Sequence, residues 1–257
     1  PPGCWAALKD KNNKNVAYGI YNSRSQLAFR VCILDKKDLH IDWVEARLIK
    51  AKKQREHIID DPLQGVTDLS GSDGLEMADL DRDGYEDIVS VHESDTTYDG
   101  KPIGHVRIAF GSVDPSQWSL VTLASGHEAA AAEDVTIADF NADGYPDVVV
   151  ACELAHLIYF ENPGRMAREM KWPRTILTAS ENRGSYIRVF AGDFSGDGQP
   201  EVVAANKGEQ NPDVDSQHLS AISIYTPSEH PLDGGGWTEQ ALGNFRIPIN
   251  SEPVDLD

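Results

Sequence analysis

Three short acidic segments carry the clearest chemical pattern in the sequence. The first runs from Asp79 to Asp87 as Asp-Leu-Asp-Arg-Asp-Gly-Tyr-Glu-Asp, and related segments begin at Asp139 and Asp193. Acidic or polar side chains at the first, third and fifth positions would crowd negative charge unless a cation neutralised it. Oxygen ligands of this kind suit Ca²⁺, which accepts about 6–8 of them. The sequence therefore predicts three calcium sites.

Each predicted site uses the side chains at loop positions one, three, five and nine and the backbone carbonyl at position seven. A glycine at position six allows the loop to turn with positive φ. Because Ser195 is a weak ligand, we expect the third site to bind calcium least tightly. The predicted ligands are Asp79, Asp81, Asp83, the Tyr85 carbonyl and Asp87 in the first loop, Asp139, Asn141, Asp143, the Tyr145 carbonyl and Asp147 in the second, and Asp193, Ser195, Asp197, the Gln199 carbonyl and Glu201 in the third.

Two other interpretations of these loops were weighed. An EF-hand needs glutamate at the twelfth position and flanking helices, whereas the twelfth positions here are Ser90, Val150 and Ala204, inside strand-like sequence. The other interpretation is an acidic hairpin loop that holds no metal. It leaves the carboxylates of each loop without a counter-charge, so calcium is the preferred prediction.

The elements that position the loops repeat with them, since the loops start 60 and then 54 residues apart. Each repeat contains four short strand signals, which is typical of a β-propeller blade. Trp118, Trp172 and Trp237 recur near the fourth strand signal, and we expect them to pack between blades. The predicted strands are 75–78, 88–91, 106–110 and 118–123, then 135–138, 148–151, 157–160 and 172–177, then 187–191, 202–205, 221–225 and 237–242.

The last residues of the sequence resemble the start of a fourth loop. Residues 252–257 read Glu-Pro-Val-Asp-Leu-Asp and stop after what would be its third position. A propeller needs about 4–8 blades to close its ring. We therefore predict a mainly β fold, an incomplete (truncated) β-propeller of three to four four-stranded blades that is cut off in the fourth, preceded by a small α+β N-terminal segment.

Charge divides the chain into two parts. Residues 1–57 carry 12 Lys and Arg against 6 Asp and Glu, whereas the remaining 200 residues have a balance of −25 within a total of −19. We predict a basic α+β segment at 1–57, with strands at 16–21 and 27–34 and a helix beginning near Asp42, and the acidic blades at 58–257. The total charge argues against nucleic-acid binding by the whole chain. No apolar run approaches the ~20 residues of a membrane-spanning helix.

The three loops, together with Asp-Ile-Val-Ser at 87–90 and Asp-Val-Val-Val at 147–150, resemble the FG-GAP or VCBS repeats of integrin-α-type β-propellers. The resemblance covers about residues 60–257. It implies a calcium ion in each blade's loop, usually structural, an extracytoplasmic (extracellular or periplasmic) location, and proteins or glycans as partners. The chain departs from the family at Glu201, where the repeat usually ends in aspartate.

A second resemblance concerns about residues 17–57. Residues 18–22, 25–26, 30–31, 41–42 and 46–48 are similar to the segment after the PUA domain of 23S rRNA cytosine methyltransferases. The methyltransferase domain itself is absent, so this segment alone is not expected to transfer a methyl group. It leaves open an RNA-associated role for residues 1–57, or a fused fragment.

Loops at the opposite end of the blades gather other polar residues that could bind a ligand. A polysaccharide lyase or hydrolase is the alternative function. In a lyase, Arg188 or Lys207 would neutralise a uronate while His92, His156 or Tyr186 removes a proton. Scattered side chains do not by themselves make a site, so the preferred hypothesis is a calcium-stabilised module that binds a protein or a carbohydrate (glycan) or has a structural role, and catalysis by it is left open. Cys152 is expected to be buried rather than nucleophilic. The residues grouped at this end are His92, Glu93, Asp95, Glu133, Asp134, Cys152, Glu153, His156, Tyr186, Arg188, Lys207, Glu209 and Glu252.

Overall fold

The computed structural model separates the chain into two compact units, residues 1–57 and 58–257. The predicted helix near Asp42 and the fourth loop at 252–257 lie outside the residues that the structure describes, which are 4–21, 29–33, 72–93, 103–213, 215 and 217–249.

The first unit contains one antiparallel sheet in the order β1-β2-β3. Its strands are β1 (Cys4–Lys9), β2 (Asn15–Tyr21) and β3 (Phe29–Ile33). The two predicted strands match β2 and β3. The sequence prediction missed β1, whose central Ala-Ala has low strand propensity and which is held by its pairing with β2.

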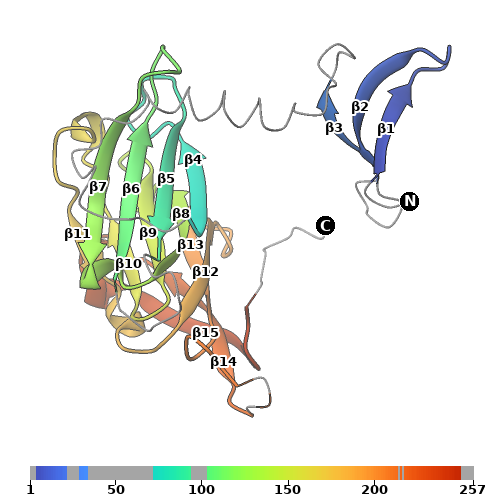
Figure 1. The fold of residues 1–257 in the computed structure, drawn as a ribbon. Helices are drawn as coiled ribbons and strands as arrows, with labels where there is room; N and C mark the ends of the chain where they lie inside the picture. The colour runs from blue at the N-terminus through green and yellow to red at the C-terminus, as the bar shows by residue number, and fades with distance from the viewer. Residues whose placement is uncertain are drawn as a thin grey trace. The chain divides into compact units, whose positions relative to one another are not determined.

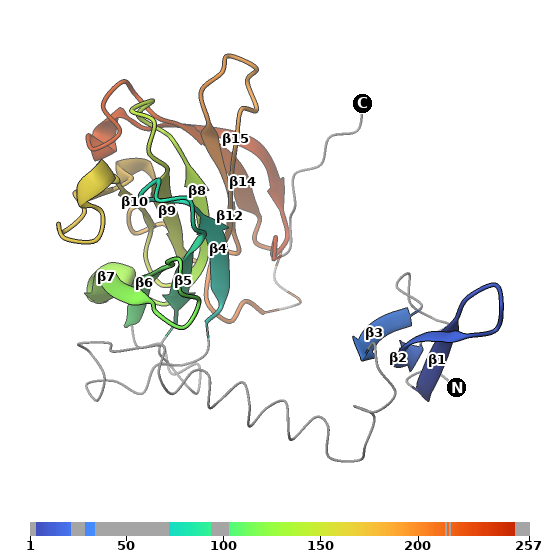
Figure 2. The same ribbon diagram turned by 90° about the horizontal axis from the view of Figure 1, so that it is seen from above.

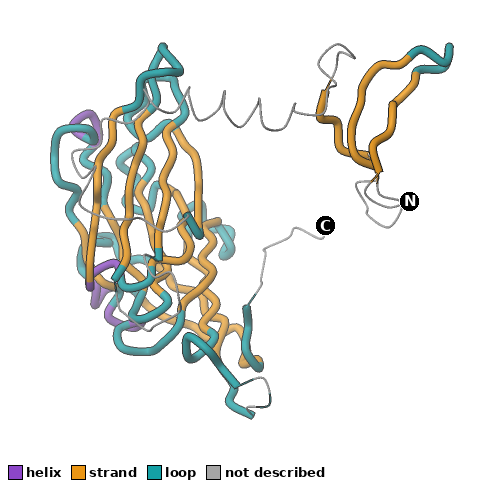
Figure 3. The backbone as a smooth tube through the Cα atoms, viewed as in Figure 1, coloured by secondary structure: helices purple, strands orange, loops and turns teal. Residues whose placement is uncertain are grey.

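The second unit consists of three four-stranded antiparallel sheets, each built from consecutive strands (Figures 1 and 3). These are three blades of an incomplete β-propeller, as predicted, and no α-helix occurs among its described residues. The strands are, in blade 1, β4 (Gly74–Ala78), β5 (Asp87–His92), β6 (Gly104–Phe110) and β7 (Ser119–Gly126); in blade 2, β8 (Ala132–Ala138), β9 (Asp147–Cys152), β10 (Leu157–Phe160) and β11 (Arg174–Ile176); and in blade 3, β12 (Tyr186–Gly192), β13 (Glu201–Asn206), β14 (Ser220–Thr226) and β15 (Thr238–Phe245).

The blades pack face to face through two apolar layers. We call the layer between blades 1 and 2 the first seam and the layer between blades 2 and 3 the second seam. β9 alternates between them: Val148 and Val150 enter the first seam, whereas Val149 and Ala151 enter the second. Both faces of this strand are therefore buried, which explains why it reads as a continuous apolar run instead of an alternating one.

The first strands of the blades, β4, β8 and β12, lie side by side (Figure 2). Each could expose unpaired backbone groups, and side chains of the preceding blade satisfy some of them. Val189 donates its N–H to Asp134 Oδ2 at 3.0 Å, and Ala191 donates to Thr136 Oγ1 at 2.9 Å. Glu76 occupies the equivalent place in the first seam, where its carboxylate accepts from the Ile137 N–H.

Each tryptophan lies just before the fourth strand of its blade, and its indole N–H donates to a backbone carbonyl in the preceding loop. Trp172 and Trp237 are buried in the first and second seams, and their indole N–H groups donate to Ala167 O and Pro231 O. The predicted packing between blades is confirmed for these two. Trp118 is only half-buried, because no described blade covers its face of blade 1.

In blades 2 and 3, the fourth strand forms an ion pair with the segment that connects the blade to the preceding one. Arg174 in β11 pairs with Glu128, in the connector between β7 and β8. Glu239 in β15 pairs with Arg183, in the connector between β11 and β12. The basic residue is in the strand in blade 2 and in the connecting segment in blade 3. An ion pair therefore occurs at the same place in both blades, with the charges exchanged.

The tryptophans provide a test of seam packing. Trp172→Ala should lower the free energy of unfolding by about 3–5 kcal/mol, because it empties a fully buried site. The matched change Trp118→Ala should cost about 1 kcal/mol, since that ring is already partly solvated. Urea unfolding followed by far-UV circular dichroism measures both. Equal losses would contradict the blade packing described above.

Glu76 provides a test of pH dependence. Burial raises the pKa of this carboxyl from its ordinary 4.5 to about 7, so the native state binds more protons than the unfolded chain between those values. The stabilisation from protonated Glu76 is complete below pH 4.5 and is lost as the pH rises through 7. Glu76→Gln should therefore be more stable than the parent by about 1–2 kcal/mol at pH 8 and equal to it at pH 4.

Urea unfolding at both pH values measures this difference. The exposed control Glu209→Gln should follow the parent at each pH. A parent stability that does not decline relative to Glu76→Gln between pH 4 and 8 would contradict the assignment.

Candidate metal centres

The three acidic loops join the first and second strands of their blades. In each blade the ninth loop residue opens the second strand and pairs with the last residue of the first: Ala78 with Asp87, Ala138 with Asp147, and Gly192 with Glu201. Because the strands are antiparallel and equivalently placed in each blade, the loops occupy the same end of every blade. The structure thus places all fifteen predicted ligands in three equivalent hairpin loops.

The first carboxylate of each loop is oriented by the backbone of the same loop. Asp79 accepts the N–H of Asp83 on Oδ1 at 3.0 Å and the N–H of Gly84 on Oδ2 at 2.9 Å. Asp139 and Asp193 accept the equivalent pairs at 2.8–3.1 Å. The glycine at position six has a φ of 90–92° in all three loops, which is the left-handed turn expected from the sequence.

The ninth carboxylate is buried and connects the loop to the third strand of its blade. Asp87 accepts the Leu80 N–H on Oδ2 at 2.9 Å and the Gly111 N–H on Oδ1 at 2.8 Å. Asp147 makes the equivalent bonds with the N–H groups of Phe140 and Asn162, and accepts the Tyr159 hydroxyl at 3.0 Å as well.

The third loop differs at this position in a way that the sequence alone did not explain. Glu201 accepts the N–H groups of Phe194 and Ser195 on Oε2 at 2.8 and 3.2 Å. The residue equivalent to Gly111 and Asn162 is Pro227, which has no N–H to donate. Glutamate therefore replaces aspartate at position nine in the blade where the residue after the third strand has no N–H to donate.

Burial opposes the ionised form of these ninth carboxylates. It raises the pKa of Asp87 to about 6 and that of Asp147 to about 7, although backbone hydrogen bonds act in the opposite direction. A nearby cation would favour the ionised form of both. Positive charge close to these two loops would therefore lower both pKa values.

The donor set fits a hard cation in two of the loops. One oxygen each from Asp79, Asp81 and Asp87 lies within 4.8 Å of the others, and the same holds for Asp193, Asp197 and Glu201. The second loop, although it is described in full, gathers no such trio of carboxylates. There the Asn141 amide donates to Asp143 Oδ2 at 3.3 Å, an orientation that turns its nitrogen toward the carboxylate.

An arginine from the neighbouring blade contacts the first loop. Arg168 binds Asp81 Oδ2, Asp83 Oδ2 at 2.6 Å and the Gly111 carbonyl at 2.9 Å, and its guanidinium lies 5.0 Å from the centre of the Phe110 ring. It neutralises part of the loop's charge. The sequence analysis missed Arg168 because it lies 87 residues from Asp81 and no motif links the two.

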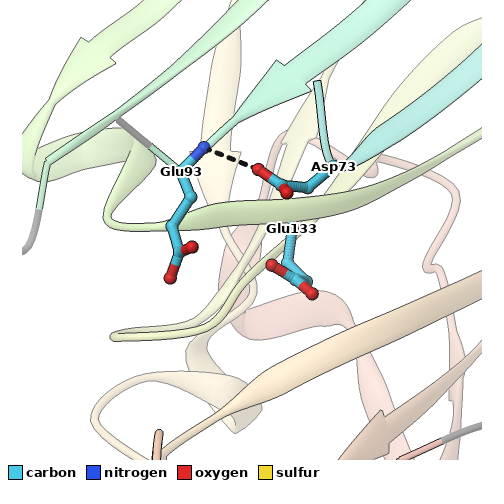
Figure 4. Close-up of side chains that lie close together, drawn as sticks. All are labelled: Asp73, Glu93 and Glu133. Atoms are coloured by element: carbon cyan, nitrogen blue, oxygen red, sulfur yellow. Dashed lines mark hydrogen bonds between the residues drawn. The ribbon is translucent and has the colours of Figure 1, made fainter. Parts of the chain in front are cut away.

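A second acidic cluster lies at the opposite end of the blades. Figure 4 shows Asp73, Glu93 and Glu133, with the Glu93 N–H donating to Asp73 Oδ2 at 3.1 Å. Burial, assisted by the charges of Glu153 and Asp73, raises the pKa of Glu133 to about 7. The sequence grouped Glu93 and Glu133 at this end but missed Asp73.

Amide and ammonium groups link this cluster to the other blades. Gln210, which the sequence analysis also missed, donates from Nε2 to Glu93 Oε1 and to Glu153 Oε2, both at 3.0 Å. Glu153 also forms an ion pair with Lys207. The opposite end is thus held together by direct contacts among all three blades.

The groups considered for lyase chemistry have protein partners. His156 Nε2 lies 2.9 Å from the Glu128 carbonyl, and the Tyr186 hydroxyl lies 3.1 Å from that of Tyr225. Burial lowers the pKa of His156 and raises that of Tyr186. Cys152 is buried, as expected, and burial raises the pKa of its thiol. Asp95 and Glu252 lie outside the described residues.

Three blades of consecutive antiparallel strands, each with an acidic loop between its first two strands, define a β-propeller repeat protein. The sequence model of the FG-GAP-like repeat matches residues 79–150 and again 139–204, and this region of the chain belongs to that family. The comparison with curated proteins gave no match. Neither comparison supports the methyltransferase resemblance of residues 17–57.

Arg168 can be tested without metal. In the presence of EDTA, Arg168→Ala should lower the free energy of unfolding by about 1 kcal/mol, because Asp81 and Asp83 lose their counter-charge in a partly exposed site. The nearby exposed Arg165→Ala should change it by less than about 0.5 kcal/mol. Urea unfolding compares the two variants, and equal effects would show that the Arg168 ion pairs do not stabilise the loop.

Proposed function

We propose that this protein is a calcium-binding β-propeller module in which the ion stabilises the blades. The observation that carries the proposal is the convergence of oxygen atoms in the first and third loops, to within 4.8 Å of one another. The two loops differ in sequence at positions two, three, four, seven, eight and nine, yet both assemble three carboxylates. Such an all-oxygen set of irregular geometry suits calcium better than a transition metal.

The ligands proposed for each site are those of the sequence analysis. When bound, calcium would neutralise the carboxylates of each loop, in the first of which Arg168 already pairs with Asp81 and Asp83. The chain's own groups orient the ligands: loop N–H groups hold the first carboxylate, and the N–H groups of Leu80 and Gly111 hold Asp87. The third site remains the weakest in this proposal, because a serine hydroxyl replaces a carboxylate or amide oxygen at position three.

We further propose that the module acts outside the cytoplasm and binds a protein or a glycan. Extracellular modules typically bind calcium with dissociation constants of about 10⁻⁴–10⁻³ M, which weak, exposed loops of this kind can supply. The acidic loops are largely exposed, and FG-GAP-like repeats are typical of extracellular domains. In the described part of the chain, no helix is both long and apolar enough to cross a bilayer.

Calcium titration tests the proposal. Isothermal titration calorimetry should show saturable binding at up to millimolar Ca²⁺, with one site fewer in the double variant Asp79→Asn/Asp81→Asn. At a hundredfold excess over the dissociation constant, each site should stabilise the folded state by about 2.7 kcal/mol, so EDTA should lower the melting temperature.

Glu169→Gln, an exposed change outside the loops, is the matched control and should keep every site. Superimposable melting curves in calcium and in EDTA, together with no saturable heat, would mean that the loops are metal-free hairpins.

A further inference from the structure

The two seams differ at the end where the acidic loops lie. In the first seam, Arg82 from the first loop lies with its guanidinium carbon 5.0 Å from the centre of the Tyr145 ring in the second loop. The Asn162 amide donates to the carbonyls of Leu80 and Pro146, at 2.9 and 2.8 Å, and so bridges the two blades. Side chains of the protein therefore fill this end of the first seam.

The second seam has none of these three side chains. Loop positions four and seven, which are Arg82 and Tyr145 in the first seam, are Ala142 and Gln199 here. Pro227 is the blade 3 equivalent of Asn162. In blade 2, Asn162 lies two residues after Phe160, which pairs with Val148. In blade 3, Pro227 lies two residues after Tyr225, which pairs with Val202. Ala142, Gln199 and Pro227 line a cavity of about 350 Å³ between blades 2 and 3, which we call the second-seam pocket.

The backbone φ at the replaced arginine position is nearly the same in both seams. Arg82 has a φ of 60° and Ala142 a φ of 56°, so both residues are in the left-handed region. At this position the seams therefore differ in the side chain. Because Ala142 and Gln199 line the second-seam pocket, it corresponds to the place of Arg82 and Tyr145 in the first seam.

The second-seam pocket is acidic. Asp197, Glu201 and the exposed Glu229 line it, whereas no Lys, Arg or His is among its lining residues. Phe140 and Pro227 supply apolar wall. An alkyl stem that carries a flat cation matches this combination, because the stem contacts apolar groups while the guanidinium fork pairs with carboxylates. The cavity is far larger than a single metal ion needs.

We propose that the second-seam pocket binds an arginine side chain of a partner polypeptide, in the place that Arg82 occupies in the first seam. The protein would thus use one position of its repeat twice, once to join its own blades and once to hold a partner. This inference goes beyond the proposed calcium function and does not depend on it. Asp197 and Glu201 are also proposed calcium ligands of the third loop, so calcium bound there would compete with arginine for them.

The test uses N-acetyl-L-arginine amide as the probe and its uncharged isostere N-acetyl-L-citrulline amide as the control. In EDTA, the arginine probe should cause saturable shifts of the backbone amide signals of Ala142, Gln199 and Glu229 in ¹⁵N–¹H spectra, with a millimolar dissociation constant. The citrulline probe should cause none. Glu229→Gln should weaken arginine binding by about two- to threefold, the loss expected for one exposed charge.

The double variant Ala142→Arg/Gln199→Tyr recreates the first-seam pair. It should abolish probe binding and raise the melting temperature, because the protein's own side chains then fill the pocket. Absence of saturable shifts in the parent, or equal shifts with the citrulline probe, would overturn the proposal whether or not the double variant folds. A failure of calcium binding is measured separately, by calorimetry, and leaves this result standing.

Discussion

A buried carboxylate at the ninth position of each loop is the interaction on which the rest of the site depends. In the first two blades it accepts one N–H from the start of the loop and one from the end of the third strand, which ties three strands together. This bond network anchors the start of the loop, and hence the side chains at positions one, three and five. It also places a carboxyl where burial opposes ionisation, so its ionised form would be favoured by positive charge nearby.

The three blades can be compared with one another, because equivalent backbone positions carry different side chains. The ion pair between a fourth strand and its connector is Arg174 with Glu128 in one blade and Glu239 with Arg183 in the next. The buried tryptophans keep their place, whereas the loop end of the seam is filled in one case and open in the other. Features common to all blades belong to the architecture, and the differences are the places where this chain can have its own partner.

The two ends of the blades have different characters. The loop end carries carboxylates that mostly accept hydrogen bonds from their own hairpin, so each loop is a local structure repeated three times. At the opposite end, Glu93, Glu153, Gln210 and Lys207 join all three blades. That end is stabilised by contacts between blades, and its polar groups are already engaged with one another.

The sequence by itself determined the local features: the strands of the three blades, the loops between their first and second strands, and the burial of Trp172 and Trp237. The strands and loops follow from spacing and residue type within about ten residues, where the alternation of side chains and the turn chemistry of glycine act directly. The burial of the tryptophans follows from their recurrence in each repeat. Only the tertiary structure decided that Arg168 reaches Asp81, that Asp73 joins Glu93 and Glu133, and that the loop end of the second seam stays open. Those contacts join residues that blade packing brings together from distant parts of the chain, and no short-range pattern encodes their geometry.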